Sequence, residues 1–153
     1  MKKIPYPPKQ LKTKQKAKEY LVELVSNAMS WLKIDGYAFS ILSQSDTDFE
    51  HDADAGFCIT VQFPYKKFRI SVQESCLKDL CEVKPSNKQY WERIERSIFH
   101  EVIHVLVWRI AELGGRRFTT AKDIHDAEEE LTDHLAIAFY ALLDEHRKGK
   151  KLG

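Results

Sequence analysis

Five consecutive residues, His100-Glu101-Val102-Ile103-His104, have the types and the spacing of a metal-binding motif. In a helix, positions i and i+4 lie one turn apart on the same face, so the two imidazoles can bind one ion. Zinc binds imidazole nitrogens at about 2.0–2.1 Å, and catalytic zinc sites keep one coordination position for water. Glu101 directly follows the first histidine and can act as general base toward that water. The motif therefore predicts a zinc site with hydrolytic chemistry.

The apolar residues around the motif favour a metal partner for the two histidines. At about 100° per residue, apolar side chains fill a broad arc of the predicted helix, and Ile103 and Val107 make the opposite side partly apolar. The arc consists of Trp91, Ile94, Ile98, Phe99, Val102, Val105 and Leu106. Polar imidazoles in such surroundings need a partner. The alternative is a pair of helical histidines and a glutamate with no metal role.

A third protein ligand has to come from outside the motif, and the last predicted helix offers an acidic run. Helical spacing places His125, Glu129 and Asp133 on one stripe of that helix. One carboxylate of this stripe could bind zinc, and a second carboxylate one turn later could hydrogen-bond a zinc ligand and hold it in place. The alternative is that Glu128-Glu129-Glu130 forms a solvated helix face. The apolar residues expected to pack inward are Ile124, Leu131, Leu135, Ala138 and Leu142.

The two motifs together, His100-Glu101-x-x-His104 and Glu129-x-x-Thr132-Asp133, resemble the signature of the gluzincins, the thermolysin-like zinc metallopeptidases. The resemblance implies that Glu129 is the third zinc ligand and that Asp133 hydrogen-bonds His100. The element order is similar to that of the small single-domain gluzincins over residues 11–147. The resemblance also implies that the protein hydrolyses peptide bonds in a peptide or protein substrate, with Zn²⁺ as the cofactor.

The sequence departs from this family pattern in two places. The family's usual asparagine before the ligand glutamate is Glu128 in this chain. The chain also has no long C-terminal subdomain to supply the histidine and tyrosine that larger relatives place on the oxyanion. We therefore expect His125, one turn before Glu129, to stabilise the oxyanion.

Two other functions remain open at the level of sequence. The first is a catalytically silent or latent zinc-stabilised scaffold that binds a protein or nucleic-acid partner. The second is zinc-dependent hydrolysis of a non-peptide bond, because a metal site fixes the chemistry better than it fixes the substrate.

Hydrophobic periodicity predicts the elements that position these residues. A period of three to four residues indicates helices, and alternation indicates three strands in which each apolar set lies on one face. We expect an α+β, zincin-like fold with an N-terminal helix, a short antiparallel three-stranded sheet, an active-site helix and a C-terminal helix. Lys67–Gln73 is the expected edge strand, to which an extended substrate could add. The expected helices span 11–33, 75–81, 87–112 and 120–147, and the strands lie near 37–41, 57–63 and 68–72.

Local signals predict how these segments begin and end. Pro64-Tyr65-Lys66 predicts a hairpin connection, Ser86 or Asn87 can cap the long helix, and Thr120-x-x-Asp123 resembles a capping box. The acidic segment 46–54 is similar to a calcium loop, but no register supplies both the required glycine and the required glutamate. We interpret this segment as a solvated loop.

Composition limits the class of protein. The 153 residues predict one main domain, 11–147, between an extended basic segment, 1–10, and a basic tail, 148–153. The longest apolar stretch is far shorter than the roughly 20 residues of a membrane span.

The formal net charge is +1, yet residues 19–146 hold 13 basic against 23 acidic residues. No aromatic residues interleave with the basic ends, so we expect solvated ends and no nucleic-acid surface. Three cysteines without a C-x-x-C pair indicate a reducing cytoplasm.

Overall fold

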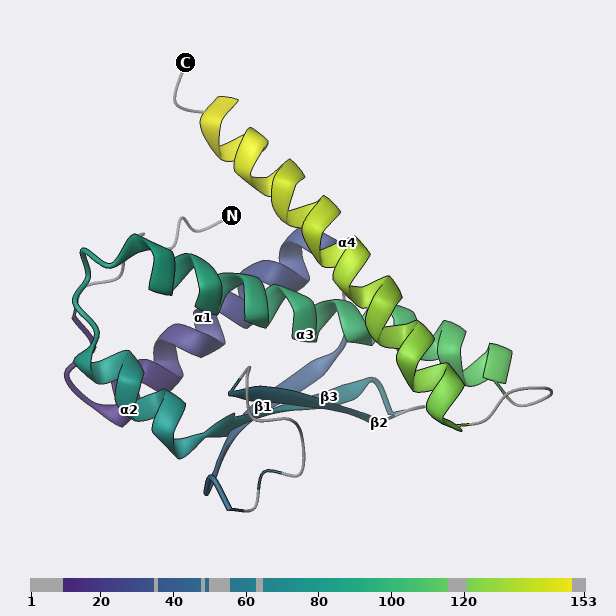
Figure 1. The fold of residues 1–153 in the computed structure, drawn as a ribbon, viewed down its shortest axis with the longest axis horizontal. Coiled ribbons are helices and arrows are strands. Elements are labelled where there is room, and N and C mark those ends of the chain that lie inside the picture. Colours follow the sequence, from purple (N-terminus) through teal and green to yellow (C-terminus); the bar gives the residue numbers. More distant parts are fainter. Residues whose placement is uncertain are drawn as a thin grey trace. The chain divides into compact units, whose positions relative to one another are not determined.

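The computed structural model describes residues 10–34, 36–47, 49, 56–62, 65–115 and 121–149 (Figure 1). These residues form an α+β fold, which confirms the predicted class. The chain divides into two compact units, residues 1–102 and 103–153, and the division falls inside the long third helix. In chain order the elements are α1 (Lys14–Leu32), β1 (Ala38–Gln44), β2 (Phe57–Gln62), β3 (Lys67–Gln73), α2 (Glu74–Glu82), α3 (Lys88–Gly115) and α4 (Ala121–Gly149).

Side-chain caps fix the start of two of these helices. Thr13 Oγ1 accepts a hydrogen bond from Lys16 N at 3.2 Å, so α1 begins three residues later than its apolar pattern suggests. Asn87 Oδ1 accepts from Tyr90 N at 3.2 Å and caps α3, as predicted. The capping box expected at Thr120 lies outside the described residues, as do residues 1–9 and 150–153. Residues 148–149 of the predicted tail belong to α4.

The sheet is mixed, and the predicted antiparallel sheet is wrong for one of its two pairings. The strand order is β1-β3-β2, with β2 antiparallel to β3 and β1 parallel to β3. Alternating sequence patterns define the faces of a strand, but they carry no information about its neighbour or its direction. The short connection between β2 and β3 forces them antiparallel, whereas β1 pairs on the other side of β3. Lys67–Gln73 is therefore the central strand, and the expected edge-strand role for it is also wrong.

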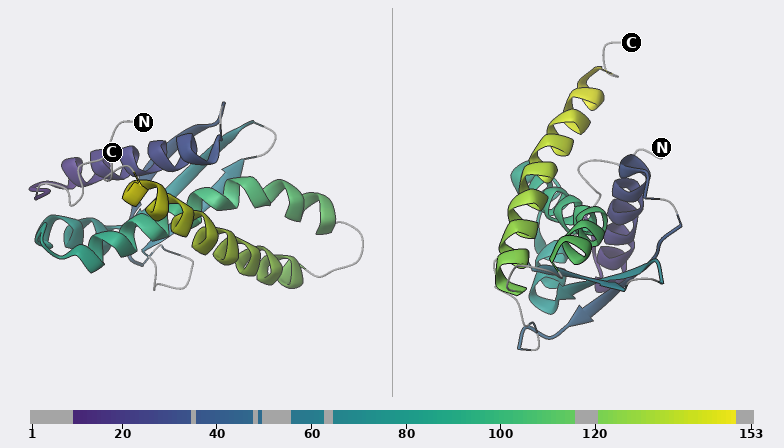
Figure 2. Two further views of the ribbon diagram at one scale, coloured as in Figure 1. Left: turned by 90° about the horizontal axis from the view of Figure 1, so that it is seen from above. Right: turned by 90° about the vertical axis from the view of Figure 1, so that its right-hand side faces the viewer.

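The predicted alternation does place the apolar residues of the three strands on one face of the sheet. Ile70 pairs with Ile41 of β1 and with Ile59 of β2, and cross-strand partners point to the same side. Phe39 stacks on Phe68 with ring centroids 5.6 Å apart. In the unit of residues 1–102, α1 and the first part of α3 cover this face of the sheet (Figure 2).

Aromatic contacts fix the first half of α3 against α1 within the same unit. Trp91 is fully buried, meets Tyr20 of α1 edge-on at 5.7 Å and donates its indole N–H to the carbonyl oxygen of Lys84 at 3.1 Å. Two turns later, Phe99 meets Trp31 of α1 at 6.2 Å. These contacts hold α3 against α1 from Trp91 to Phe99, the residue that precedes His100.

The buried stripe of α4 differs from the predicted one. Leu131, Ala138 and Leu142 are exposed and Leu135 is half-buried, so the expectation that they pack inward is wrong. The side chain of Ile124 lies outside the described ones. Among the side chains of α4 that the structure describes, the buried ones are instead Glu128, Thr132, Ala136 and Leu143. Two of these four are polar, which means that α4 is oriented by polar contacts that a hydrophobic pattern does not reveal.

The loop after β1 supports the start of α2. Because Gln44 pairs with Gln73 in parallel register, Asp46 and Ser75 lie at the same distance past the ends of their strands. Asp46 Oδ1 accepts hydrogen bonds from Ser75 N at 3.2 Å and from Ser75 Oγ at 2.9 Å. Gln73, the residue that precedes α2, makes no side-chain cap. Asp46 therefore takes the role of a cap from a distant part of the chain; the other acids of segment 46–54 lie outside the described residues.

We predict that Asp46→Ala lowers the free energy of unfolding by about 1 kcal/mol, because two donors at the start of α2 lose their acceptor. Asp46→Asn keeps an acceptor oxygen and should lose less. Urea unfolding measures both effects, and Asp46→Asn serves as the matched comparison. An Asp46→Ala protein as stable as the parent would show that this contact does not stabilise α2.

Candidate metal centre

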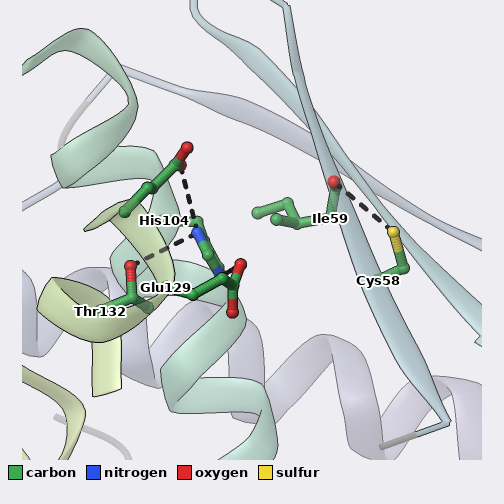
Figure 3. Close-up of polar contacts among 6 residues, drawn as sticks. Cys58, Ile59, His104, Glu129 and Thr132 are labelled. Atoms are coloured by element: carbon green, nitrogen blue, oxygen red, sulfur yellow. Dashed lines mark hydrogen bonds and ion pairs between the residues drawn. The ribbon is translucent and has the colours of Figure 1, made fainter. Parts of the chain in front are cut away.

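His104 lies on α3 with both ring nitrogens next to polar groups of α4. Its Nε2 atom is 3.3 Å from Glu129 Oε1, and its Nδ1 atom is 3.3 Å from Glu128 Oε1. Thr132 Oγ1 is 3.4 Å from the same Nδ1 atom (Figure 3). His104 is only 7% exposed, so these groups take the place that water would occupy around a surface imidazole.

Helical geometry explains why the three α4 groups divide between the two ring nitrogens. Glu128 and Thr132 are four residues apart and therefore lie on one face of α4, where both reach Nδ1. Glu129 is rotated by about 100° from Glu128, and its carboxylate reaches the opposite edge of the ring, at Nε2. The acidic run is thus not simply a solvated face, because two of its three glutamates contact a buried histidine.

The geometry brings three predicted ligands together. His100 precedes His104 by one turn of α3, and the candidate ligand atoms of His100, His104 and Glu129 all lie within 4.8 Å of one another. Two ligands of a tetrahedral zinc ion, each about 2.0–2.2 Å from the metal, lie about 3.3–3.6 Å apart. The 3.3 Å between His104 Nε2 and Glu129 Oε1 matches that separation. Two imidazoles and one carboxylate also form a donor set of catalytic zinc sites.

The other predicted site residues lie around this group without belonging to it. Glu101 is on α3 and is 7% exposed, so the motif places a buried carboxylate next to the first histidine. His125 is exposed on α4, one turn before Glu129. Asp133 is exposed one turn after Glu129, and its expected bond to His100 stays a prediction. The roles of Glu101 and His125 in catalysis are likewise predictions.

Burial and a nearby histidine act on Glu128 in opposite directions. Burial raises the pKa of the Glu128 carboxyl above its ordinary value, because the charged form loses solvation, and the charge of His125 partly lowers it. His125 therefore acts electrostatically on Glu128.

The sequence prediction missed the partners of Nδ1. In the sequence, Glu128 stands out only as a departure from the family's asparagine, and Thr132 only as part of the second motif. Their spacing of four residues was the available signal, because it predicts that both side chains reach the same neighbour whenever one of them does.

Two of the three cysteines lie where the thiol form is favoured. Cys58, Cys76 and Cys81 form no disulfide with one another. Burial raises the pKa of the Cys76 thiol to about 11, and burial also raises the pKa of Cys81. A thiol is nucleophilic as the thiolate, so neither environment activates the sulfur near neutral pH.

Comparison of the chain with protein-family models, with curated proteins and with solved structures gives no match. None of the helices in the described part of the chain has the length and the hydropathy that a bilayer span requires.

We predict that Glu129→Gln weakens zinc binding by more than the roughly 10–100-fold that loss of a supporting contact costs. The amide is a poorer metal ligand than the carboxylate and carries no charge. Competition with a chromophoric chelator measures the affinity. Glu130→Gln, an exposed neighbour, is the matched control and should bind zinc like the parent. Equal losses in the two variants would remove Glu129 from the ligand set.

Proposed function

We propose that this protein is a zinc-dependent metallopeptidase of the gluzincin type. In this proposal His100, His104 and Glu129 are the zinc ligands, Glu101 is the general base and Asp133 orients His100. The observation that supports it most strongly is the 3.3 Å separation of His104 Nε2 and Glu129 Oε1, with His100 in the same group. At that distance the two atoms can share a proton or bind one cation, and the presence of His100 in the same group favours the cation.

The donor set favours zinc over the common hard cations. Calcium and magnesium take oxygen ligands almost exclusively, whereas two of the three donors in this group are imidazole nitrogens. A set of three protein ligands also leaves a fourth position, which is the arrangement of catalytic zinc sites and not of closed structural ones. These features support a hydrolytic centre over a purely structural one.

A zinc ion in such a site polarises a carbonyl group and lowers the pKa of water toward about 7. The Glu101 carboxylate then takes a proton from the attacking water while the water oxygen bonds to the carbonyl carbon of the substrate. The same carboxyl gives that proton to the amide nitrogen as the carbon–nitrogen bond breaks. A carboxylate that is 7% exposed is suited to this work, because it is shielded from bulk water that would compete for the proton.

The remaining parts of the proposal concern the substrate and its surroundings. The substrate is a peptide or protein, and His125 stabilises the oxyanion from its place one turn before Glu129. The protein acts in the cytoplasm, where three cysteines that form no disulfide stay reduced. His125→Ala should then lower kcat and leave zinc affinity unchanged.

We predict that Glu101→Gln keeps zinc and loses peptide hydrolysis by at least about 100-fold, because the amide cannot accept the proton from water. Cleavage of a quenched fluorescent peptide library gives the rate, and atomic absorption gives the zinc content. Glu92→Gln, at an exposed position on the same helix, is the matched control and should behave like the parent.

The same pair of measurements separates the proposal from a zinc-stabilised scaffold. A scaffold binds zinc in both proteins and cleaves no peptide in either. A parent protein that holds zinc stoichiometrically but has no chelator-sensitive peptidase activity would therefore contradict the proposed function. Activity that survives in Glu101→Gln would contradict the proposed role of the base.

A further inference from the structure

We propose that Glu128, assisted by Thr132, is a positioning residue that fixes which nitrogen of His104 is presented to the metal. The inference rests on the proposed function, since it concerns a ligand of that site. It also concerns a different histidine from the one that the gluzincin resemblance assigns to Asp133. The supporting contacts are 3.3 Å from Glu128 Oε1 and 3.4 Å from Thr132 Oγ1 to His104 Nδ1.

A neutral imidazole exists in two forms. One ring nitrogen carries a proton and donates, and the other has a lone pair and can bind a metal. A carboxylate oxygen next to Nδ1 accepts a hydrogen bond and repels a lone pair. Glu129 Oε1 lies at the same 3.3 Å from Nε2, but its side chain is 41% exposed, so water screens its charge, whereas that of Glu128 is 8% exposed. Thr132 Oγ1 adds a second possible acceptor at Nδ1 only. Glu128 and Thr132 together therefore favour the form of His104 with the proton on Nδ1. The lone pair then lies on Nε2, which is the nitrogen next to Glu129.

Thr132 supports the same arrangement by the way it is buried. Its side chain is 0% exposed, and its hydroxyl lies on the face of α4 that also carries Glu128. A hydroxyl can accept from Nδ1–H or donate to a neighbouring acceptor, so it satisfies the polar group of His104 without opposing Glu128.

Glu128, which stands where the gluzincins have an asparagine, acts on the His104 ring differently from an asparagine. An asparagine amide can either donate or accept, so it selects neither form of the imidazole by itself. A carboxylate accepts only, and a charge-assisted hydrogen bond of this kind is stronger than one between neutral groups. It also makes the imidazole a more basic ligand. Glu128 thus fixes the ring more firmly than the residue that it replaces.

The test reads the protonation of His104 directly and does not need an active enzyme. Long-range proton–nitrogen spectra of the metal-free protein identify the protonated nitrogen of His104, with the assignment made from a His104→Gln variant. We expect a proton on Nδ1 in the parent. We expect Glu128→Leu, which has no acceptor, to shift the neutral ring toward the form protonated on Nε2. Glu130→Gln, exposed and adjacent, is the control and should leave the spectrum of His104 unchanged.

Zinc affinity of the same proteins gives the second readout, measured by chelator competition with Zn²⁺ alone. Glu128→Leu should bind zinc roughly 10–100-fold more weakly than the parent. Glu128→Gln, the variant closest in shape, should fall between the two, and Thr132→Val should show a smaller loss. Should Glu128→Leu fail to fold, Glu128→Gln provides both readouts.

The outcomes distinguish this inference from the proposed function. A bare Nδ1 in the parent, or a spectrum that does not change in the Glu128 variants, overturns the positioning role whether or not zinc binds. A protonated Nδ1 that depends on Glu128, in a protein with no affinity for zinc, supports the positioning role and overturns the proposed function.

Discussion

The candidate site depends on the need of one buried imidazole to satisfy both of its nitrogens. His104 lies where apolar side chains surround α3, and water does not reach it freely. Glu128, Glu129 and Thr132 of α4 supply the polar groups that the ring requires. The contact orients α4 through its polar face, and it brings a second carboxylate to the histidine pair. The His104 side chain therefore takes part in the packing of α4, in the charge interactions of the site and in the proposed ligand set.

Hydrophobic periodicity predicted the elements of the fold because it reports which side of each segment is buried. The helices around Leu24 and Trp91 and the strands around Ile59 and Ile70 form close to their expected places. The direction of β1 could not be predicted, because the connection from β1 to β2 is long enough for β1 to pair with the free edge of β3 in either direction. The parallel pairing in turn brings Asp46 to Ser75, a contact that no local pattern contains.

The candidate site was predictable where spacing within a helix determines proximity, and it was missed where two helices meet. His100 and His104 lie on one face of a helix by geometry alone, and the second motif indicated Glu129. The inward face of α4 was assigned to Leu131 and Leu142 on the assumption that apolar residues decide which face is buried. Burying a histidine without a partner costs more than leaving a leucine half exposed, so the polar face turns inward.

The most direct test of this account is an anomalous diffraction experiment at the zinc edge on crystals of the protein grown with Zn²⁺. The account predicts one anomalous peak per chain, bounded by His100, by His104 Nε2 and by the Glu129 carboxylate. Glu128 should contact His104 Nδ1 and should not bind the ion. A peak bound to other residues, or no peak at this group in crystals that contain zinc, would contradict the assignment of the metal centre.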